Sequence, residues 1–281
     1  MHAKQRAEAL IRDWQPCPGD IGAPALSGDN LGRQWTQLHA GDLEPYPQNP
    51  TLQDAWRRYH EGDFARAVVS GLSAGAEGLV PSAFAITTYA CYLEQCGSRK
   101  RSLLLQVMDW CERAQLDGRS TPNLHYVYAL AMNRYSQAMS MIEIVTEGFG
   151  LRIREQAERC LALEKGHSDA HLLLGAWHAQ MCTSAGQLMA AVIYGANRVA
   201  AITHYELAIE LAADSPVPYL SYATGLELMF ADSRREQEID LLTCARSKPG
   251  IDAKQRLDQR TARTRLQALY AAPAGSPVAP T

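Results

Sequence analysis

The sequence lacks both long apolar runs and a strong excess of charge of one sign. Its longest apolar run, at residues 188–196, is too short to span a bilayer, and the first residues lack the apolar segment of a secretory signal peptide. We therefore expect a cytoplasmic protein with no membrane span. Lys and Arg total 27 against 30 Asp and Glu. This near-balance argues against a nucleic-acid-binding surface, which is normally basic.

Aromatic residues are also few, at 7% of the chain, and segments with the alternating pattern of β-strands are rare. The apolar fraction of 47% is still large enough for a sizeable core, and it excludes wholesale disorder. Alanine and leucine are abundant, which favours helices. Seven scattered cysteines, an odd number, fit reduced thiols used as small core residues. The sequence thus predicts an all-α fold with free thiols.

Four regions of the chain differ in composition. Residues 1–50 combine a short amphipathic helix with an arm rich in Pro and Gly, and residues 51–248 carry a succession of helix pairs. Residues 249–272 predict a polar-faced helix that caps the last pair, because the end of a stack of helices needs such a cover. Residues 273–281 predict a flexible tail.

Small residues recur where neighbouring helices are expected to approach most closely. In the first helix of each pair they are Ala55, Ala90, Ala129, Gly175 and Ala223. In the second helix, the last residue of a regularly spaced triplet is Ala74, Ala114, Cys160, Ala208 and Ala245. Antiparallel helices pack closest where side chains are smallest, with large residues filling the gaps beside them. Gly62 and Asp63 mark the first turn as C-cap and N-cap.

This register resembles the tetratricopeptide repeat over roughly residues 51–248. The resemblance implies a right-handed α-solenoid of about five antiparallel helix pairs. The first-helix markers lie 35, 39, 46 and 48 residues apart, against about 34 in that family, so the third and fourth units are irregular and lengthened. The extra stretches, "SMIEIVTEGFG" and "TSAGQLMAAVIYGA", are apolar enough that we expect them to be buried, as lengthened helices or a packed crossover. The second half is also similar to helical-repeat proteins of the TRAP-transporter T-component type.

The resemblance also implies a concave groove lined by the first helix of each unit. Polar and aromatic residues at helical spacing there predict contacts to a ligand or peptide backbone, and arginines predict charge complementarity to an acidic partner. The candidates are Tyr126, Asn133, Arg134, Gln137, Ser140, His171, His178 and Arg198.

Three functions from different classes remain open. The leading hypothesis is a non-enzymatic scaffold that binds a protein segment or peptide in the groove. We expect it to need no cofactor and to bind no nucleic acid. We also expect that it can associate with itself through an exposed end of the solenoid. The second is a small-molecule-binding component whose cavity is closed by the insert of the fourth unit. The third is a metal-dependent site, since His171, His178 and Cys182 fall near one helix face. The favoured role for these histidines is packing or lining of the groove, because no accompanying metal-binding motif is present.

Overall fold

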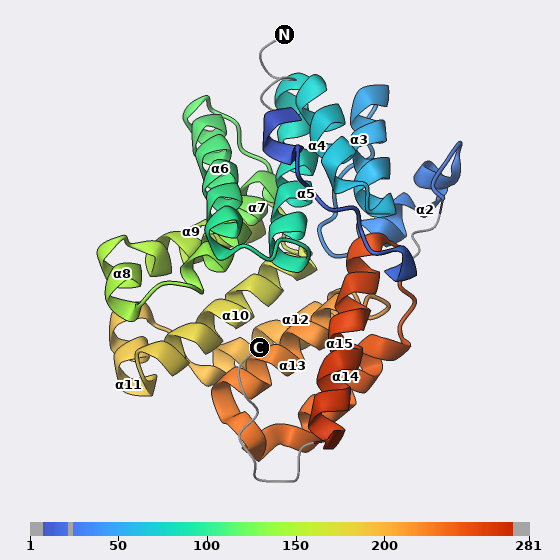
Figure 1. The fold of residues 1–281 in the computed structure, drawn as a ribbon. Helices are drawn as coiled ribbons and strands as arrows, with labels where there is room; N and C mark the ends of the chain where they lie inside the picture. Colours follow the sequence, from blue (N-terminus) through green and yellow to red (C-terminus); the bar gives the residue numbers. More distant parts are fainter. Residues whose placement is uncertain (1–7, 22–24, 272–281) are drawn as a thin grey trace.

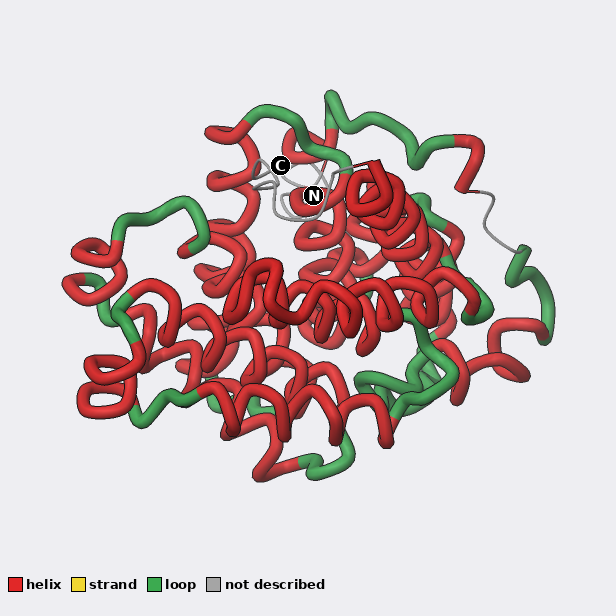
Figure 2. Tube along the Cα trace, turned by 90° about the horizontal axis from the view of Figure 1, so that it is seen from below, coloured by secondary structure: helices red, strands yellow, loops and turns green. Residues whose placement is uncertain are grey.

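A computed structural model describes residues 8–21 and 25–271, and these residues form helices and loops with no strand among them. Figures 1 and 2 show the helices packed side by side in successive pairs. Their bounds are η1 Gly19–Ile21, α2 Asn30–Leu38, α3 Pro50–Glu61, α4 Phe64–Ser73, η2 Gly75–Gly78, α5 Leu79–Tyr92, α6 Gly97–Leu116, α7 Pro122–Ser136, α8 Met141–Thr146, α9 Phe149–Leu163, α10 Ser168–Ser184, α11 Gln187–Met189, η3 Ala190–Tyr194, α12 Arg198–Leu211, α13 Val217–Phe230, η4 Ala231–Arg234, α14 Arg235–Ser247 and α15 Ala253–Ala271.

Five helix pairs follow one another along the chain: α3 with α4, α5 with α6, α7 with α9, α10 with α12 and α13 with α14. The first helices of successive pairs also contact one another, so they form one inner layer and their partners form an outer layer. In Figure 1 the helices from α3 to α6 stand roughly upright, whereas α10, α12 and α13 run across the view. The predicted all-α, solenoid-like stacking of helix pairs is confirmed.

The small residues that mark the repeats lie at the helix contacts. Nine of the ten are buried, and only Ala74 is half-buried. At Gly175, a methyl group would come within 3.0 Å of the Tyr205 ring. At Gly71, it would come within 2.2 Å of the Ser82 hydroxyl oxygen on α5. The close approach of neighbouring helices therefore depends on these residues having almost no side chain.

Local sequence signals fix where the helices begin and end. Gly62 ends α3 at φ 84°, and the Asp63 carboxylate accepts a hydrogen bond from the first turn of α4, as predicted. The helix α7 begins at Pro122, where the missing N–H costs nothing, and the Thr121 hydroxyl accepts a hydrogen bond from the Leu124 N–H. These starts set the register of the inner helices, and so decide which residues face inward.

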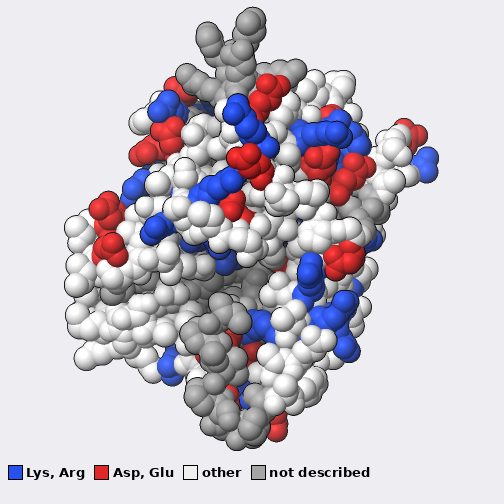
Figure 3. All heavy atoms as spheres, in the orientation of Figure 1, with Lys and Arg blue, Asp and Glu red and all other residues white. Residues whose placement is uncertain are grey.

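The two extra stretches do not pack as predicted. They form the short helix α8 and the segment α11–η3, and several of their large apolar side chains are exposed rather than buried. Ile142 is 79% exposed and Leu188 is 76% exposed. Each stretch is too short to bury both of its faces against the regular pairs, so its outer face meets water. In Figure 3 the lower left edge, where α11 lies, is correspondingly poor in charge.

The described residues of the N-terminal arm pack against the first pairs, and none of them lines a cavity on the inner helices. Residues 8–11 are helical, while residues 2–7 of the predicted helix lie outside the described residues. The Trp14 ring stacks on the Tyr89 ring at 3.9 Å between centroids, and the Gln15 N–H donates a hydrogen bond to the Tyr89 hydroxyl. Leu26 and Trp35 are buried. The predicted arm is thus an ordered cover on the first pairs.

The C-terminal helix α15 caps the last pair, as predicted, but it also reaches back to α3 and η1. Just before α15, Asp252 accepts a hydrogen bond from His60 Nδ1 at 2.8 Å. His60 Nε2 lies 3.0 Å from His39 Nε2, and His39 Nδ1 lies 2.7 Å from Asp42. All four side chains are buried. This chain of polar contacts ties the arm, α3 and the start of α15 together. The predicted tail at 273–281 lies outside the described residues.

No helix in the described ranges is long and apolar enough to cross a membrane. All seven cysteines are free thiols, as the sequence predicted.

Candidate functional site

A groove follows the inner layer and forms a cavity of about 480 Å³. Its lining comes from the inner helices α5, α7, α10 and α13, with single contributions from α6 and α12, and α15 forms one side. Figure 3 shows a hollow near the centre of this face, with Lys and Arg side chains along its upper border. The position of the groove, on the inner helices, matches the prediction.

The lining of the groove combines apolar and polar side chains. Leu173 and Tyr205 are buried there, and the Tyr205 ring fits against the bare backbone of Gly175 and Gly225. A methyl group on Gly225 would meet that ring at 2.5 Å. Two glycines on neighbouring inner helices thus make room for one aromatic ring from the outer layer.

Four of the predicted site residues line the groove: Tyr126, Asn133, Arg134 and Gln137. All four belong to α7 or its last turn, at spacings that place them on one helix face. Tyr126 and Asn133 are buried in the floor, whereas Gln137 is exposed at the mouth. The predicted polar stripe of this helix is therefore present in the groove.

Two other predicted residues, Ser140 and Arg198, lie outside the groove. Ser140 is the N-cap of α8 and forms a capping box with Glu143. Arg198 begins α12, and its guanidinium lies over the Phe230 ring at 4.8 Å from the centroid. Ser140 was predicted from its helical spacing to the preceding residues, but α7 ends at Ser136, and Arg198 belongs to α12, which is an outer helix.

His171 and His178 also lie outside the groove, at the contact between α10 and α12. His171 Nδ1 lies 3.0 Å from His204 Nδ1, and the His178 ring stacks on the His204 ring. Burial lowers the pKa of all three histidines, and that of His178 falls to about 4. Their role in this fold is helix packing, the favoured interpretation from the sequence. Within residues 8–21 and 25–271 we find no group of three or more His, Cys, Asp or Glu side chains placed to hold a metal ion.

The side of the groove formed by α15 carries opposite charges in contact. Lys254 Nζ lies 3.0 Å from Asp258, which also accepts a hydrogen bond from the Tyr92 hydroxyl across the groove on α5. Burial raises the pKa of Asp169 to about 6, and the nearby Lys254 ammonium opposes that rise. The charged groups on this side largely satisfy one another.

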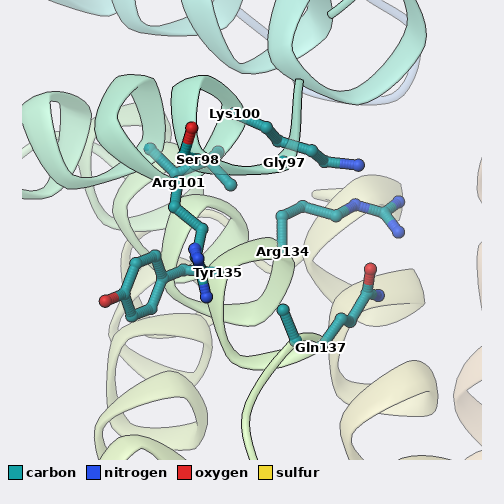
Figure 4. Close-up of a pocket in the computed structure, with 9 residues that line it drawn as sticks. Gly97, Ser98, Lys100, Arg101, Arg134, Tyr135 and Gln137 are labelled. Carbon is teal, nitrogen blue, oxygen red and sulfur yellow. The ribbon is translucent and has the colours of Figure 1, made fainter. Parts of the chain in front are cut away.

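A side pocket of about 460 Å³ opens where α6 begins and α7 ends. It shares Lys100, Arg134 and Gln137 with the groove, so the two spaces are adjacent. In Figure 4, Lys100 and Arg134 extend in the same direction with Gln137 below them, and Arg101 lies beside Tyr135. Three cationic side chains therefore surround one end of the groove.

Several lining residues were missed from the sequence. Thr87, Thr88 and Tyr92 belong to α5, which is nearly all buried and shows no polar stripe, so nothing marks its inner face. Lys254 and Asp258 belong to the helix that was predicted only as a cap. Polar residues on a terminal helix look the same in sequence whether they face water or a groove.

Residues 81–268 match the family described as Regulator of microtubule dynamics protein 1-3. The chain belongs to this family. No curated protein matches the chain closely enough to report.

The family match extends from α5 to α15 and so contains every residue that lines the groove and its side pocket. The arm and the first helix pair precede it. The groove thus belongs to the part of the chain that defines the family.

Proposed function

We propose that this protein is a non-enzymatic scaffold that binds an extended protein segment in its groove. The observation that carries the proposal is the cavity of about 480 Å³ on the inner layer, which is lined by both apolar side chains and hydrogen-bonding groups. Apolar pockets of this kind take up alternate side chains of a bound segment, and the polar groups meet its backbone. The family is described as one of regulators of microtubule dynamics, and a role directed at other proteins supports a protein ligand.

We also propose that the helix pairs are tetratricopeptide-like units. The support is the set of small residues in register, nine of which are buried at helix contacts. A repeat of this type presents its first helices on the concave side, which is where the groove lies. The cytoplasmic location and self-association stay predictions.

A bound small molecule is a second candidate, and one feature favours it. The groove is not open along its length, because α15 covers one side, and a cavity of about 480 Å³ lies within the usual range of small-molecule sites. The closing element is α15 and not the insert of the fourth unit, since no residue of that insert lines the cavity.

The proposal can be tested by blocking the groove. Ala176 lies on its floor and is half-buried, so Ala176→Trp fills the cavity without opening the core. The matched control is Ala162→Trp on the exposed face of α9. Peptides selected from a displayed random library against the full chain should bind the wild type and the control, and should lose most of their affinity for Ala176→Trp. Selected peptides that bind all three proteins equally would refute the groove as the peptide site.

The second candidate gives a different result. A tightly held small molecule would travel with the purified protein and appear in native mass spectra of the full chain as an added mass. We expect no added mass with the wild type. An added mass that disappears in Ala176→Trp would instead favour a small-molecule site.

A further inference from the structure

The side pocket at the start of α6 is lined by three cationic side chains and by no acidic one. Lys100 and Arg101 come from the first turn of α6, and Arg134 comes from the last turn of α7. The remaining lining residues are neutral. A cavity of about 460 Å³ is therefore surrounded by positive charge from two helices.

These three charges are not neutralised by hydrogen bonds or ion pairs to described residues. Most arginines in the first half of the chain do form ion pairs, and the neighbouring Arg99 pairs with Glu94 at 3.3 Å. Arg134 is half-buried, so its guanidinium has lost part of its water, and Asp258 acts on it only at a distance, without a hydrogen bond or ion pair. Partly dehydrated cations bind carboxylates more strongly than fully exposed ones do, because the hydrogen bonds are charge-assisted and less screened.

We propose that this pocket binds the carboxylates of an acidic peptide segment whose remaining residues lie in the groove. The inference rests on the proposed function and adds the charge of the ligand and the end of the groove that holds it. The groove and the pocket share three lining residues, so one extended segment can occupy both.

The arrangement of the cations favours several carboxylates over a single anion. Figure 4 shows Lys100 and Arg134 directed to one side of the pocket, while Arg101 lies beside Tyr135. One phosphate or sulfate beside Lys100 and Arg134 would leave Arg101 without an anionic partner. An extended chain with two or more acidic side chains can, and the Gln137 amide at the mouth offers hydrogen bonds to its backbone.

Fluorescence anisotropy with defined probes tests the inference. The probes are a fluorescein-labelled peptide of about twelve residues with alternating Glu and Ala, and the same peptide with Gln in place of Glu. The full-length wild type should bind the Glu peptide at least tenfold more tightly than the Gln peptide. Arg134→Gln should weaken binding of the Glu peptide about tenfold and leave binding of the Gln peptide unchanged. Raising the salt concentration from 50 to 200 mM should weaken the binding of the Glu peptide and leave the binding of the Gln peptide unchanged.

A matched control removes one positive charge from α6, the helix that carries Lys100 and Arg101. Arg113 is exposed on α6 outside the pocket, and Arg113→Gln should bind the Glu peptide as the wild type does. If Arg113→Gln weakens binding as much as Arg134→Gln, the effect is one of net charge and the inference fails. Circular dichroism of both variants shows whether each is folded. If Arg134→Gln does not fold, Lys100→Gln provides a second variant of the pocket.

The failures of the inference and of the proposed function can be told apart. Library-selected neutral peptides that lose affinity for Ala176→Trp but not for Arg134→Gln would support the groove and overturn the acidic segment. If the Glu peptide binds Ala176→Trp as tightly as the wild type, acidic groups bind the pocket without the groove, and a segment spanning both is refuted. The wild type could instead sediment with vesicles that contain phosphatidylserine and fail to bind the Glu peptide. If Arg134→Gln abolishes that sedimentation, the ligand of the pocket is a lipid surface, and the acidic peptide is refuted.

Discussion

Acidification should weaken the junction between α9 and α10 through a single histidine. His167 is fully buried just before α10. Its Nδ1 accepts a hydrogen bond from the Ala170 N–H, so the proton of the neutral ring lies on Nε2, which donates to Asn123 Oδ1 at 3.0 Å. Protonation of Nδ1 would place its new N–H against the Ala170 N–H and so break this hydrogen bond. Burial is the main reason that the pKa of His167 falls to about 4 from 6.5.

The sign and size of the effect follow from these two pKa values. As the pH falls from 7 to 5, His167 becomes protonated in the unfolded chain but stays neutral in the folded one. Acid therefore stabilises the unfolded state, and the free energy of unfolding should fall by about 2 kcal/mol from this residue alone. His167→Asn keeps an acceptor for the Ala170 N–H but does not titrate. Between pH 7 and pH 5, the free energy of unfolding of this variant should therefore fall by about 2 kcal/mol less than that of the wild type.

Urea unfolding followed by circular dichroism at pH 7 and pH 5 measures the difference. Ser168→Ala is the control, because it removes a buried hydrogen bond to Ala208 O at the same junction without changing any titrating group. It should lower the free energy of unfolding equally at both pH values. If His167→Asn shows the same pH dependence as the wild type, folding does not lower the pKa of His167, and the reasoning from its burial and ring hydrogen bonds is wrong.

Three further predictions concern stability and reactivity. Gly225→Ala should lower the free energy of unfolding by about 1–3 kcal/mol, because the added methyl group meets the Tyr205 ring; thermal unfolding measures the loss. Burial raises the pKa of Glu44 to about 7 from 4.5, so the folded chain takes up a proton between these values and is stabilised by acid. Glu44→Gln should remove that gain, and urea unfolding should then show a larger loss between pH 7 and 5 than in the wild type. Hydrogen bonds from the Ser98 hydroxyl and, to a smaller extent, from nearby backbone N–H groups lower the pKa of the exposed Cys96 thiol. A limiting amount of iodoacetamide at pH 7 should therefore alkylate Cys96 before the buried thiols, which peptide mass mapping measures. Equal labelling of all seven cysteines would contradict this.

The repeat architecture could be predicted because it rests on a local requirement. A helix contact needs a small residue at a fixed place, and Ala129, Gly175 and Ala223 mark three such places within their own helices. The same logic found the part of the groove on α7, since Asn133 and Arg134 follow from the period of one helix. Where structure follows from spacing along one helix, sequence is sufficient.

The inserted stretches could not be predicted in the same way. Their apolar residues suggested burial, but Ile142 and Leu188 are exposed, because a helix of one or two turns cannot cover itself and the regular pairs leave it only one face to pack against. Apolar composition shows what a segment would gain by burial, and it does not show whether a partner surface is within reach.

The groove depends on the least predictable contact of all, the return of α15 to the first pairs. Asp252 meets His60 from 192 residues away, and Asp258 meets Tyr92 from 166 residues away. No local period records such contacts, although they narrow the groove and neutralise the acidic groups on its α15 side. Asp258 of α15 also acts electrostatically on Arg134, although it does not line the side pocket. The distribution of charge around the groove is therefore a property of how the last helix packs back on the first pairs and not of any single repeat.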